Sequence, residues 1–278
     1  MTPVTAVKAR ELGRSSVVVG DRVRLVGNLG GGPDALVRIV GTLPRRTVLR
    51  RTADDDDPVE RIVVANADQL VIVTALADPP PRTRLIDRCV AAALDAGLDP
   101  LLCLTKVDLA PAEPLVAQYD PLGLPVVVTS RDDPIDVLAD RLADRVSVLV
   151  GHSGVGKSTL VNLVIPTAER STGDVNAVTG RGRHTSTSAV ALALPGGGWV
   201  VDTPGIRSFG LAHLRPQGLI RAFPDLAAVT TDCPRGCTHQ DGEPECALDT
   251  AVADGRLPAE RVASFRRLLA SRDRHAGD

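Results

Sequence analysis

The sequence predicts a three-part α/β protein, in which a parallel sheet with helices on both faces lies between a small β unit and a helical, metal-binding unit. Three observations predict this arrangement. Short β-branched runs separated by turns fill the first 64 residues. Buried strands then alternate with helices from residue 65 onward. Three cysteines and a histidine crowd together near the C-terminus. We therefore expect units at 1–64, 65–211 and 212–278.

The first unit is expected to be a partial, OB-like β-barrel. Its predicted strands lie at 17–27, 35–41, 47–51 and 61–64. Four consecutive aspartates at 54–57 oppose packing and predict a solvated turn. This unit contains no aromatic residue, so an oligonucleotide on its surface would be held by phosphate contacts rather than by base stacking.

Composition bounds the class of protein. The 278 residues are 44% apolar, enough for one large or several small cores. No stretch approaches about 18 apolar residues and no basic-then-apolar leader is present, so we expect a cytoplasmic protein with no membrane contact and no disulfides. Ten basic and three acidic side chains in 1–53 give +7, and residues 255–275 give +4. Basic flanks suggest a polyanionic partner, although a general preference for arginine remains the alternative.

The central motif follows an apolar run that ends at Val150. Gly151-His-Ser-Gly-Val-Gly-Lys-Ser158 fits the phosphate-loop pattern G-x-x-x-x-G-K-[ST], with a predicted strand before it and a helix after it. The glycines let backbone N–H groups converge on phosphate oxygens, Lys157 adds a charge, and Ser158 offers a hydroxyl to Mg²⁺. The chain has only three lysines, which indicates that Lys157 and Lys106 are kept where a compact ammonium is needed.

The identity of the nucleotide base is predicted by the motif Thr105-Lys-Val-Asp108, which lies at the end of another predicted strand. A carboxylate in the plane of the base accepts hydrogen bonds from the ring N–H and the exocyclic amine of guanine, and adenine offers neither. Asp108 therefore selects GTP over ATP, and the stem of Lys106 is expected to lie along the base. Asp202-Thr-Pro-Gly205 completes the set, with Asp202 holding Mg²⁺ through water.

The order of these motifs is reversed relative to an ordinary small GTPase, in which the phosphate loop comes first. Circular permutation is the simplest account, because the termini of a compact domain are often close and can be rejoined without changing the sheet. We therefore expect a circularly permuted P-loop GTPase domain at 65–211.

These residues resemble the RsgA (YjeQ) family, circularly permuted GTPases of bacterial small-subunit ribosome biogenesis. The resemblance extends over nearly the whole chain and rests on the motifs above, on Gly182-Arg-His-Thr-Ser-Thr187 and on the cysteine cluster. It implies GTP hydrolysis coupled to late maturation of the small ribosomal subunit, with contacts to the subunit and its rRNA. The chain departs from the family pattern at Thr105, where asparagine is usual, and in a barrel that lacks its first strands.

The resemblance and the motifs together give a candidate nucleotide site. The expected nucleotide-binding residues are Thr105, Lys106, Asp108, Ser130, Gly151, Ser153, Gly154, Val155, Gly156, Lys157, Ser158, Thr159, Thr185, Asp202 and Gly205. Mg²⁺ is expected to accompany GTP and to be held by Ser158, Asp202 and a threonine, either Thr185 or Thr187, between which the sequence alone does not choose.

Hydrolysis needs a water molecule in line with the γ-phosphate. Ile206 stands where small GTPases often carry glutamine, and it cannot orient water. We expect His184 to polarise the water and Lys157 to assist catalysis. His184 lies in the segment 182–187, which is expected to close over the γ-phosphate, and the alternative that it only orders this segment stays open.

The cysteine cluster predicts one structural zinc ion. Cys233, Cys237, His239 and Cys246 supply four ligands, which fill a tetrahedral site and leave no position for water. Three residues separate Cys233 from Cys237 and six separate His239 from Cys246, whereas the family pattern has four and five residues in these two gaps. Cys89 and Cys103 lie in apolar patterns and are expected to be buried thiols.

A helix is predicted after the cysteine cluster, at 258–270. Its apolar stripe contains Val262, Phe265, Leu268 and Leu269. Arg261, Arg266 and Arg267 lie off this stripe, and we expect them to be exposed, either as a solvated face or as a phosphate clamp on rRNA.

The sequence thus predicts a monomeric GTP hydrolase of ribosome assembly. One rival is a zinc-bearing RNA-binding adaptor whose nucleotide is only structural. The other is a P-loop kinase or ATPase acting on a small molecule, against which Asp108 argues.

Overall fold

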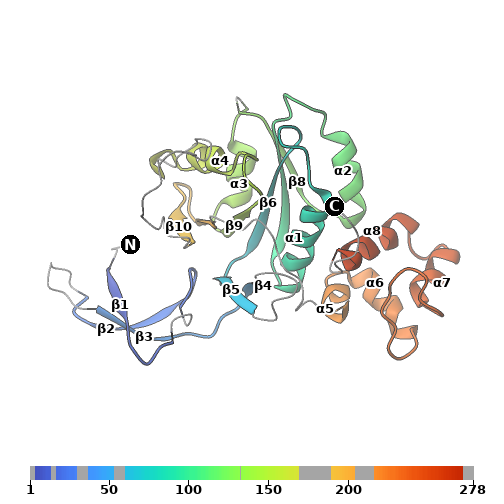
Figure 1. The fold of residues 1–278 in the computed structure, drawn as a ribbon, viewed down its shortest axis with the longest axis horizontal. Coiled ribbons are helices and arrows are strands. Elements are labelled where there is room, and N and C mark those ends of the chain that lie inside the picture. The colour runs from blue at the N-terminus through green and yellow to red at the C-terminus, as the bar shows by residue number, and fades with distance from the viewer. Residues whose placement is uncertain are drawn as a thin grey trace, which may run out of the picture.

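A computed structural model of the chain describes residues 4–13, 17–29, 37–52, 60–131, 133–168, 189–203 and 216–271. A central sheet separates N-terminal strands, drawn in blue, from C-terminal helices, drawn in orange and red (Figure 1). This is the predicted order of three parts.

The central sheet has six strands in the spatial order β10-β11-β9-β6-β7-β8. Every neighbouring pair is parallel except β10 and β11. The predicted parallel sheet is thereby confirmed, but β10 was not foreseen, because its four residues are largely exposed and lack a buried apolar run. The strands are β6 (Gln69–Ala75), β7 (Asp99–Thr105), β8 (Val126–Thr129), β9 (Val146–Val150), β10 (Val190–Ala193) and β11 (Trp199–Asp202).

Helices cover both faces of this sheet, as predicted. Alternate residues of β6 explain why: Leu70 and Ile72 join one apolar core, and Val71 and Val73 join the other. The first core includes residues of α1 (Thr83–Asp95), α2 (Glu113–Tyr119) and the C-terminal helices, and the second includes residues of α3 (Asp136–Leu142) and α4 (Lys157–Val164). Two short 3₁₀ helices, η1 (Asp120–Leu122) and η2 (Pro166–Ala168), follow α2 and α4.

Strand order explains how a permuted chain can assemble one site. Strand β9, which precedes the predicted phosphate loop, lies between β6 and β11. Strands β6 and β7 come before β9 in the chain, whereas β11 comes after it. Because these strands are parallel, the loops at their carboxyl ends meet at one edge of the sheet, which is where open α/β sheets bind ligands.

The N-terminal unit forms two sheets among its described residues. Strands β1 (Ala6–Lys8), β3 (Val37–Thr42) and β2 (Val23–Gly27) make one, and β4 (Val48–Thr52) and β5 (Glu60–Ala65) make the other. One bridge, between Val19 and Val64, connects the region before β2 with β5. The OB-like barrel itself stays a prediction. Strand β1 was not predicted, because three residues carry too little periodicity.

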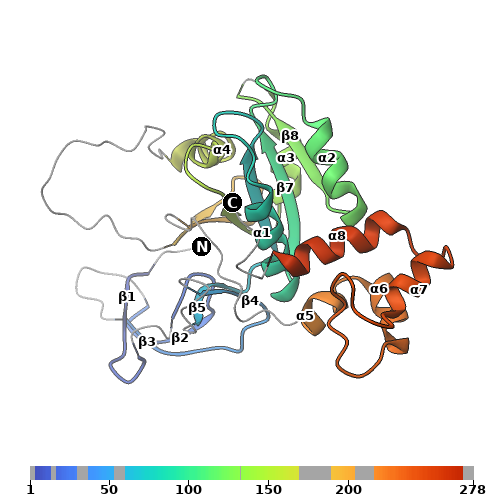
Figure 2. The same ribbon diagram turned by 45° about the vertical axis from the view of Figure 1, so that its right-hand side comes forward.

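The C-terminal unit consists of α5 (Pro216–Arg221), α6 (Pro224–Val229), η3 (Thr230–Asp232), α7 (Ala247–Ala253) and α8 (Ala259–Ala270). Figures 1 and 2 both show α8 between α1, which packs on the central sheet, and the loops that precede α7. The predicted apolar stripe of α8 is buried, with Phe265 fully inaccessible. Among the described residues, no helix is long and apolar enough to span a bilayer.

The expected arginine ridge on α8 is wrong. Arg261 pairs with Asp225, Arg266 with Asp249, and Arg267 with Asp87, and the side chains of these arginines are 20%, 13% and 31% exposed. The helix is enclosed on two sides, so residues off its apolar stripe meet acidic partners instead of solvent. These arginines are therefore engaged within the chain and are not a free phosphate clamp.

Candidate functional site

A pocket of about 360 Å³ lies at the carboxyl edge of the sheet. Its volume falls in the range of small-molecule sites, roughly 300 to 1,000 Å³. Asp108, which follows β7, and Gly156, which precedes α4, line the same pocket although they are far apart in sequence. The lining residues are Thr105, Lys106, Asp108, Leu109, Thr129, Ser130, Arg131, Gly156, Thr159, Leu160 and Leu163. The structure thus brings together six of the predicted nucleotide-binding residues.

The phosphate loop occupies 151–156, between β9 and α4. Its backbone requires glycine at Gly151, because a Cβ atom there would lie 2.2 Å from the carbonyl oxygen of Val73 and φ is +149°. Gly154 and Gly156 also have positive φ, +83° and +96°. The turn therefore packs directly against β6, and α4 begins at Lys157 with its first N–H groups at the loop.

Lys157 points back into this loop. Its ammonium donates hydrogen bonds to the carbonyl oxygens of Gly151 and His152, the second at 2.8 Å. Burial lowers the pKa of Lys157, and the carboxylate of Asp202 partly opposes that shift. Asp202 ends β11, opposite Leu149 of β9. The predicted loop lysine and the predicted magnesium residue are therefore close enough to interact, and β9 and β6 separate the strand of Asp202 from β7, which precedes Asp108.

Thr105 connects the guanine motif to the phosphate loop. The residue is buried, and its hydroxyl donates to the carbonyl oxygen of Val155 at 2.7 Å, with the carbonyl oxygen of Thr74 further off at 3.3 Å. A hydroxyl has one proton to donate, so the shorter contact is favoured. The observed contacts of Thr105 are thus with backbone carbonyls of the neighbouring segments.

Lys106 lines the pocket and has a left-handed backbone conformation, which is strained for a lysine. Its φ is +60°, and its ammonium donates to the carbonyl oxygen of Asp78 in the loop after β6. The next residue of that loop, Pro79, lies 3.5 Å from where a Cβ on Gly154 would stand. The loops after β6, β7 and β9 therefore contact one another around the pocket.

His152 is a residue whose position the sequence did not single out. It is buried, its Nδ1 lies 2.8 Å from the carbonyl oxygen of Ser153, and its Nε2 has no hydrogen-bond partner among the described residues. Burial lowers the pKa of His152, and Arg82 and Lys157 lower it further. The phosphate-loop pattern accepts any residue at this position, so it carries no signal that would single out His152.

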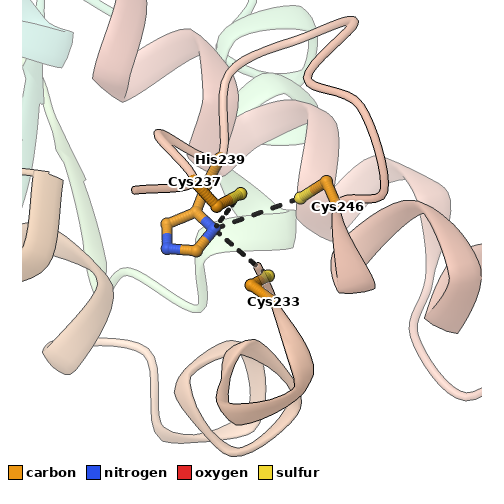
Figure 3. Close-up of side chains that lie close together, drawn as sticks. All are labelled: Cys233, Cys237, His239 and Cys246. Carbon is orange, nitrogen blue, oxygen red and sulfur yellow. Dashed lines mark hydrogen bonds between the residues drawn. The ribbon is translucent and has the colours of Figure 1, made fainter. Parts of the chain in front are cut away.

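The second candidate site is a metal centre. Figure 3 shows the Nδ1 atom of His239 facing the sulfur atoms of Cys233, Cys237 and Cys246, at 3.6, 3.3 and 4.0 Å. Tetrahedral coordination at ordinary zinc distances places a sulfur and a nitrogen about 3.6 Å apart. All four ligand atoms lie within 4.8 Å of one another. This predicted Cys₃His group is therefore assembled and can hold a metal ion.

Burial favours the neutral forms of His239 and Cys237 in this group. Burial lowers the pKa of His239, which keeps the imidazole neutral and able to ligate. Burial raises the pKa of the Cys237 thiol to about 12, so a bound cation would have to displace its proton. By contrast, Cys89 and Cys103 are buried singly, as predicted, and burial raises the pKa of each thiol to about 12.

Several predicted residues cannot be placed. His184, Thr185, Thr187, Gly205 and Ile206 lie outside the described residues. The predicted roles of these residues in magnesium binding and water activation therefore stay predictions.

A phosphate loop and an acidic base-reading motif on parallel strands, in reversed chain order, define a circularly permuted GTPase. Two solved structures share this fold. YjeQ from Thermotoga maritima aligns with a TM-score of 0.67 and 27% identity over 95% of this chain and 86% of that one. YloQ, described as a circularly permuted GTPase, aligns with a TM-score of 0.63 and 27% identity over 93% and 82%.

The family model of the RsgA GTPase matches residues 42–212. A Pseudomonas aeruginosa protein named small ribosomal subunit biogenesis GTPase RsgA is 42% identical over 266 residues, covering 92% of this chain and 76% of its own. A protein of the same name from Chlorobaculum parvum is 37% identical over 270 residues, covering 94% and 87%. The chain belongs to the RsgA GTPase family, as its sequence motifs predicted.

Thr105→Val tests the contact between the two motifs. The substitution keeps the shape of the side chain but leaves the carbonyl of Val155 without its donor, which should cost about 1–3 kcal/mol of stability. GDP affinity should also fall, because the loop loses its attachment to β7. Both quantities are measured by denaturant unfolding and by fluorescent-nucleotide titration.

Thr230→Val is the matched control, because the Thr230 hydroxyl also donates to a backbone carbonyl, that of Ala227, far from the pocket. It should leave GDP affinity unchanged. Wild-type GDP affinity in Thr105→Val would contradict the structural role of this contact.

Proposed function

We propose that this chain hydrolyses GTP to GDP and phosphate while bound to the small ribosomal subunit during its late maturation. The observation that carries the proposal is the single pocket lined by both Asp108 and the phosphate loop. A carboxylate there can distinguish guanine from adenine, and the loop beside it can hold the phosphates. The relatives named above as small-subunit biogenesis GTPases support the choice of partner.

Each end of the nucleotide has its own group of residues. Asp108 would accept hydrogen bonds from guanine, and Lys106 would lie against the base. Backbone N–H groups from Ser153 to Thr159 would surround the phosphates, and Lys157 would exchange its two carbonyl contacts for phosphate oxygens. Holding the γ-phosphate in this way fixes its orientation for in-line attack and offsets developing charge.

Magnesium is expected with GTP. Ser158 and Asp202 are suitable ligands, the second through water, together with Thr185 or Thr187. The ion, when bound, neutralises charge on the β- and γ-phosphates. We further propose that His184 orients the attacking water, and that Ser130 and Gly205 complete the contacts to base and γ-phosphate.

We also propose that the Cys₃His group holds one zinc ion with a structural role. The donor set of three thiolates and one imidazole is typical of zinc. All four donors come from the chain, so no position remains for a reacting water molecule.

Contacts to rRNA are assigned to the basic N-terminal unit. Arg38 of β3 is exposed and pairs in register with Val7 of β1 and Val26 of β2, so these three side chains share one face of the sheet. Arg24 lies two residues before Val26 on β2 and is also exposed, which places it on the same face. That face has no aromatic side chain, so it would recognise phosphates rather than stack bases. With the α8 arginines engaged in ion pairs, this face is the better candidate for binding rRNA.

We also propose that the protein is cytoplasmic and monomeric, with units at 1–64, 65–211 and 212–278.

The proposal predicts that isolated small subunits stimulate GTP hydrolysis. Turnover of GTP should be slow alone and rise at least about tenfold with saturating subunits, because the subunit would complete the arrangement around the attacking water. Phosphate release is the measurement, and large subunits are the control. Tight GTP binding with no stimulated turnover would instead support an RNA-binding adaptor with a structural nucleotide.

Zinc content is tested on purified protein. We expect about one zinc ion per chain by elemental analysis, and Cys237→Ser should lose it and become less stable, because metal binding contributes to folding. Cys103→Ser is the control, since that thiol is buried alone in β7. Full zinc retention in Cys237→Ser would contradict the assigned ligand set.

A further inference from the structure

Helix α8 contacts both helices that leave the nucleotide-facing loops. The loop after β6 leads into α1, and the loop that carries Asp108 leads into α2. The Nε–H of Arg267 on α8 is shared between the two carboxylate oxygens of Asp87 on α1, each at 3.2 Å, and its Nη2 donates to the carbonyl oxygen of Gln118 on α2 at 3.3 Å. One side chain of the C-terminal unit therefore holds both helices.

The end of α2 is held by further contacts. The guanidinium of Arg267 lies 5.1 Å from the ring centroid of Tyr119, which is fully buried and donates to the carbonyl oxygen of Thr83 on α1. Arg261 donates to the carbonyl oxygen of Pro121 in η1 at 2.8 Å and is itself fixed by two bonds to Asp225. We refer to Arg261 and Arg267 as the α8 clamp.

The clamped helix begins close to the base-reading carboxylate. Only residues 109–112 separate Asp108 from the start of α2, and the amides of Leu115 and Val116 are bonded to the carbonyl oxygen of Ala112. The N–H of Leu109 bonds back to the carbonyl oxygen of Lys106. With a short connection and a helix fixed at its far end, Asp108 has little freedom to shift relative to the phosphate loop.

The same helix contacts the metal centre through the neighbouring residue. Arg266 donates to the carbonyl oxygen of His239 at 3.1 Å and forms two bonds with Asp249 of α7. Residues 266 and 267 thus connect the metal-binding loop on one side of α8 with the guanine-reading segment on the other.

Building on the proposed function, we propose that the α8 clamp positions Asp108 for guanine recognition, so that the C-terminal unit is a positioning element for base specificity. Anything that displaces α8 would then weaken guanine binding, and guanine binding would by the same amount oppose that displacement. The clamp residues act through α2 and do not touch the nucleotide.

Base discrimination tests this without ribosomes. Inosine diphosphate (IDP) lacks the exocyclic amine that GDP carries. The ratio of the two affinities therefore reports the hydrogen bond from that amine to Asp108. A bond to a charged group should make the wild-type ratio about tenfold or more. Affinities of the isolated full chain are measured by competition with a fluorescent GDP analogue in the presence of Mg²⁺.

Arg267→Gln and Arg261→Gln should each lower the GDP-to-IDP affinity ratio several-fold, because a displaced Asp108 loses two hydrogen bonds from GDP but only the ring N–H bond from IDP. Arg267→Gln leaves the buried carboxylate of Asp87 without its arginine partner, which can destabilise the fold. The double variant Asp87→Asn/Arg267→Gln also removes the negative charge of Asp87 and so tests the loss of the clamp without a buried unpaired charge. Arg256→Gln is the matched control, because Arg256 forms an exposed pair with Asp254 before α8.

An unchanged ratio in folded clamp variants would overturn the proposal, as would equal losses of GDP and IDP affinity, which indicate general destabilisation. A wild-type ratio near one would remove the base-reading role of Asp108 and the clamp's function with it. Lack of stimulation by ribosomal subunits would overturn only the proposed partner, so the two failures are distinguishable.

Discussion

The site depends on the close packing of the phosphate loop against β6 and β7, two strands that come earlier in the chain. Gly151 lies against the carbonyl of Val73 on β6, where no side chain fits, and Thr105 at the end of β7 donates to the carbonyl of Val155 within the loop. These contacts join a base-reading motif and a phosphate-binding loop that the chain order separates. Because they need only neighbouring parallel strands, permutation leaves them intact.

The C-terminal unit is joined to the central sheet by polar contacts as well as by an apolar core. Asp87 and Arg88 lie on adjacent positions of α1 and both bond to the C-terminal end of α8, at Arg267 and at the carbonyl oxygen of Ser271. Removing one partner of such a buried pair is costly, which favours a single arrangement of the two units. The metal centre then orders the loop on the outer side of α8, so the metal and nucleotide sites share one supporting helix.

Much of this architecture could be predicted from the sequence, because its signals are local. The runs of β6, β7 and β9 are almost wholly buried and read as parallel strands, and the phosphate loop carries its own glycine pattern. The metal group could be predicted from the type and number of its ligands, and the altered spacing is accommodated where His239 and Glu245 adopt positive φ.

The errors and omissions arose where tertiary contacts decide. Strands β1 and β10 are short and contain no fully buried residue, so they have no distinct apolar pattern. The α8 arginines were expected to face solvent, yet their acidic partners come from α1, α6 and α7, which periodicity along one helix cannot reveal. The buried position of His152 is likewise set by the loop that packs around it, not by the motif.

The central claim is that Asp108 reads the base whose phosphates the loop holds, and nucleotide competition on Asp108→Asn measures this directly. An asparagine amide can donate a hydrogen bond where the carboxylate only accepts, so it suits xanthine, which carries a carbonyl in place of guanine's exocyclic amine. The account predicts that wild type prefers GDP over XDP and that the variant reverses this preference, while Thr105, Lys157 and the fold are unaffected. A variant that keeps the wild-type preference for GDP would contradict it.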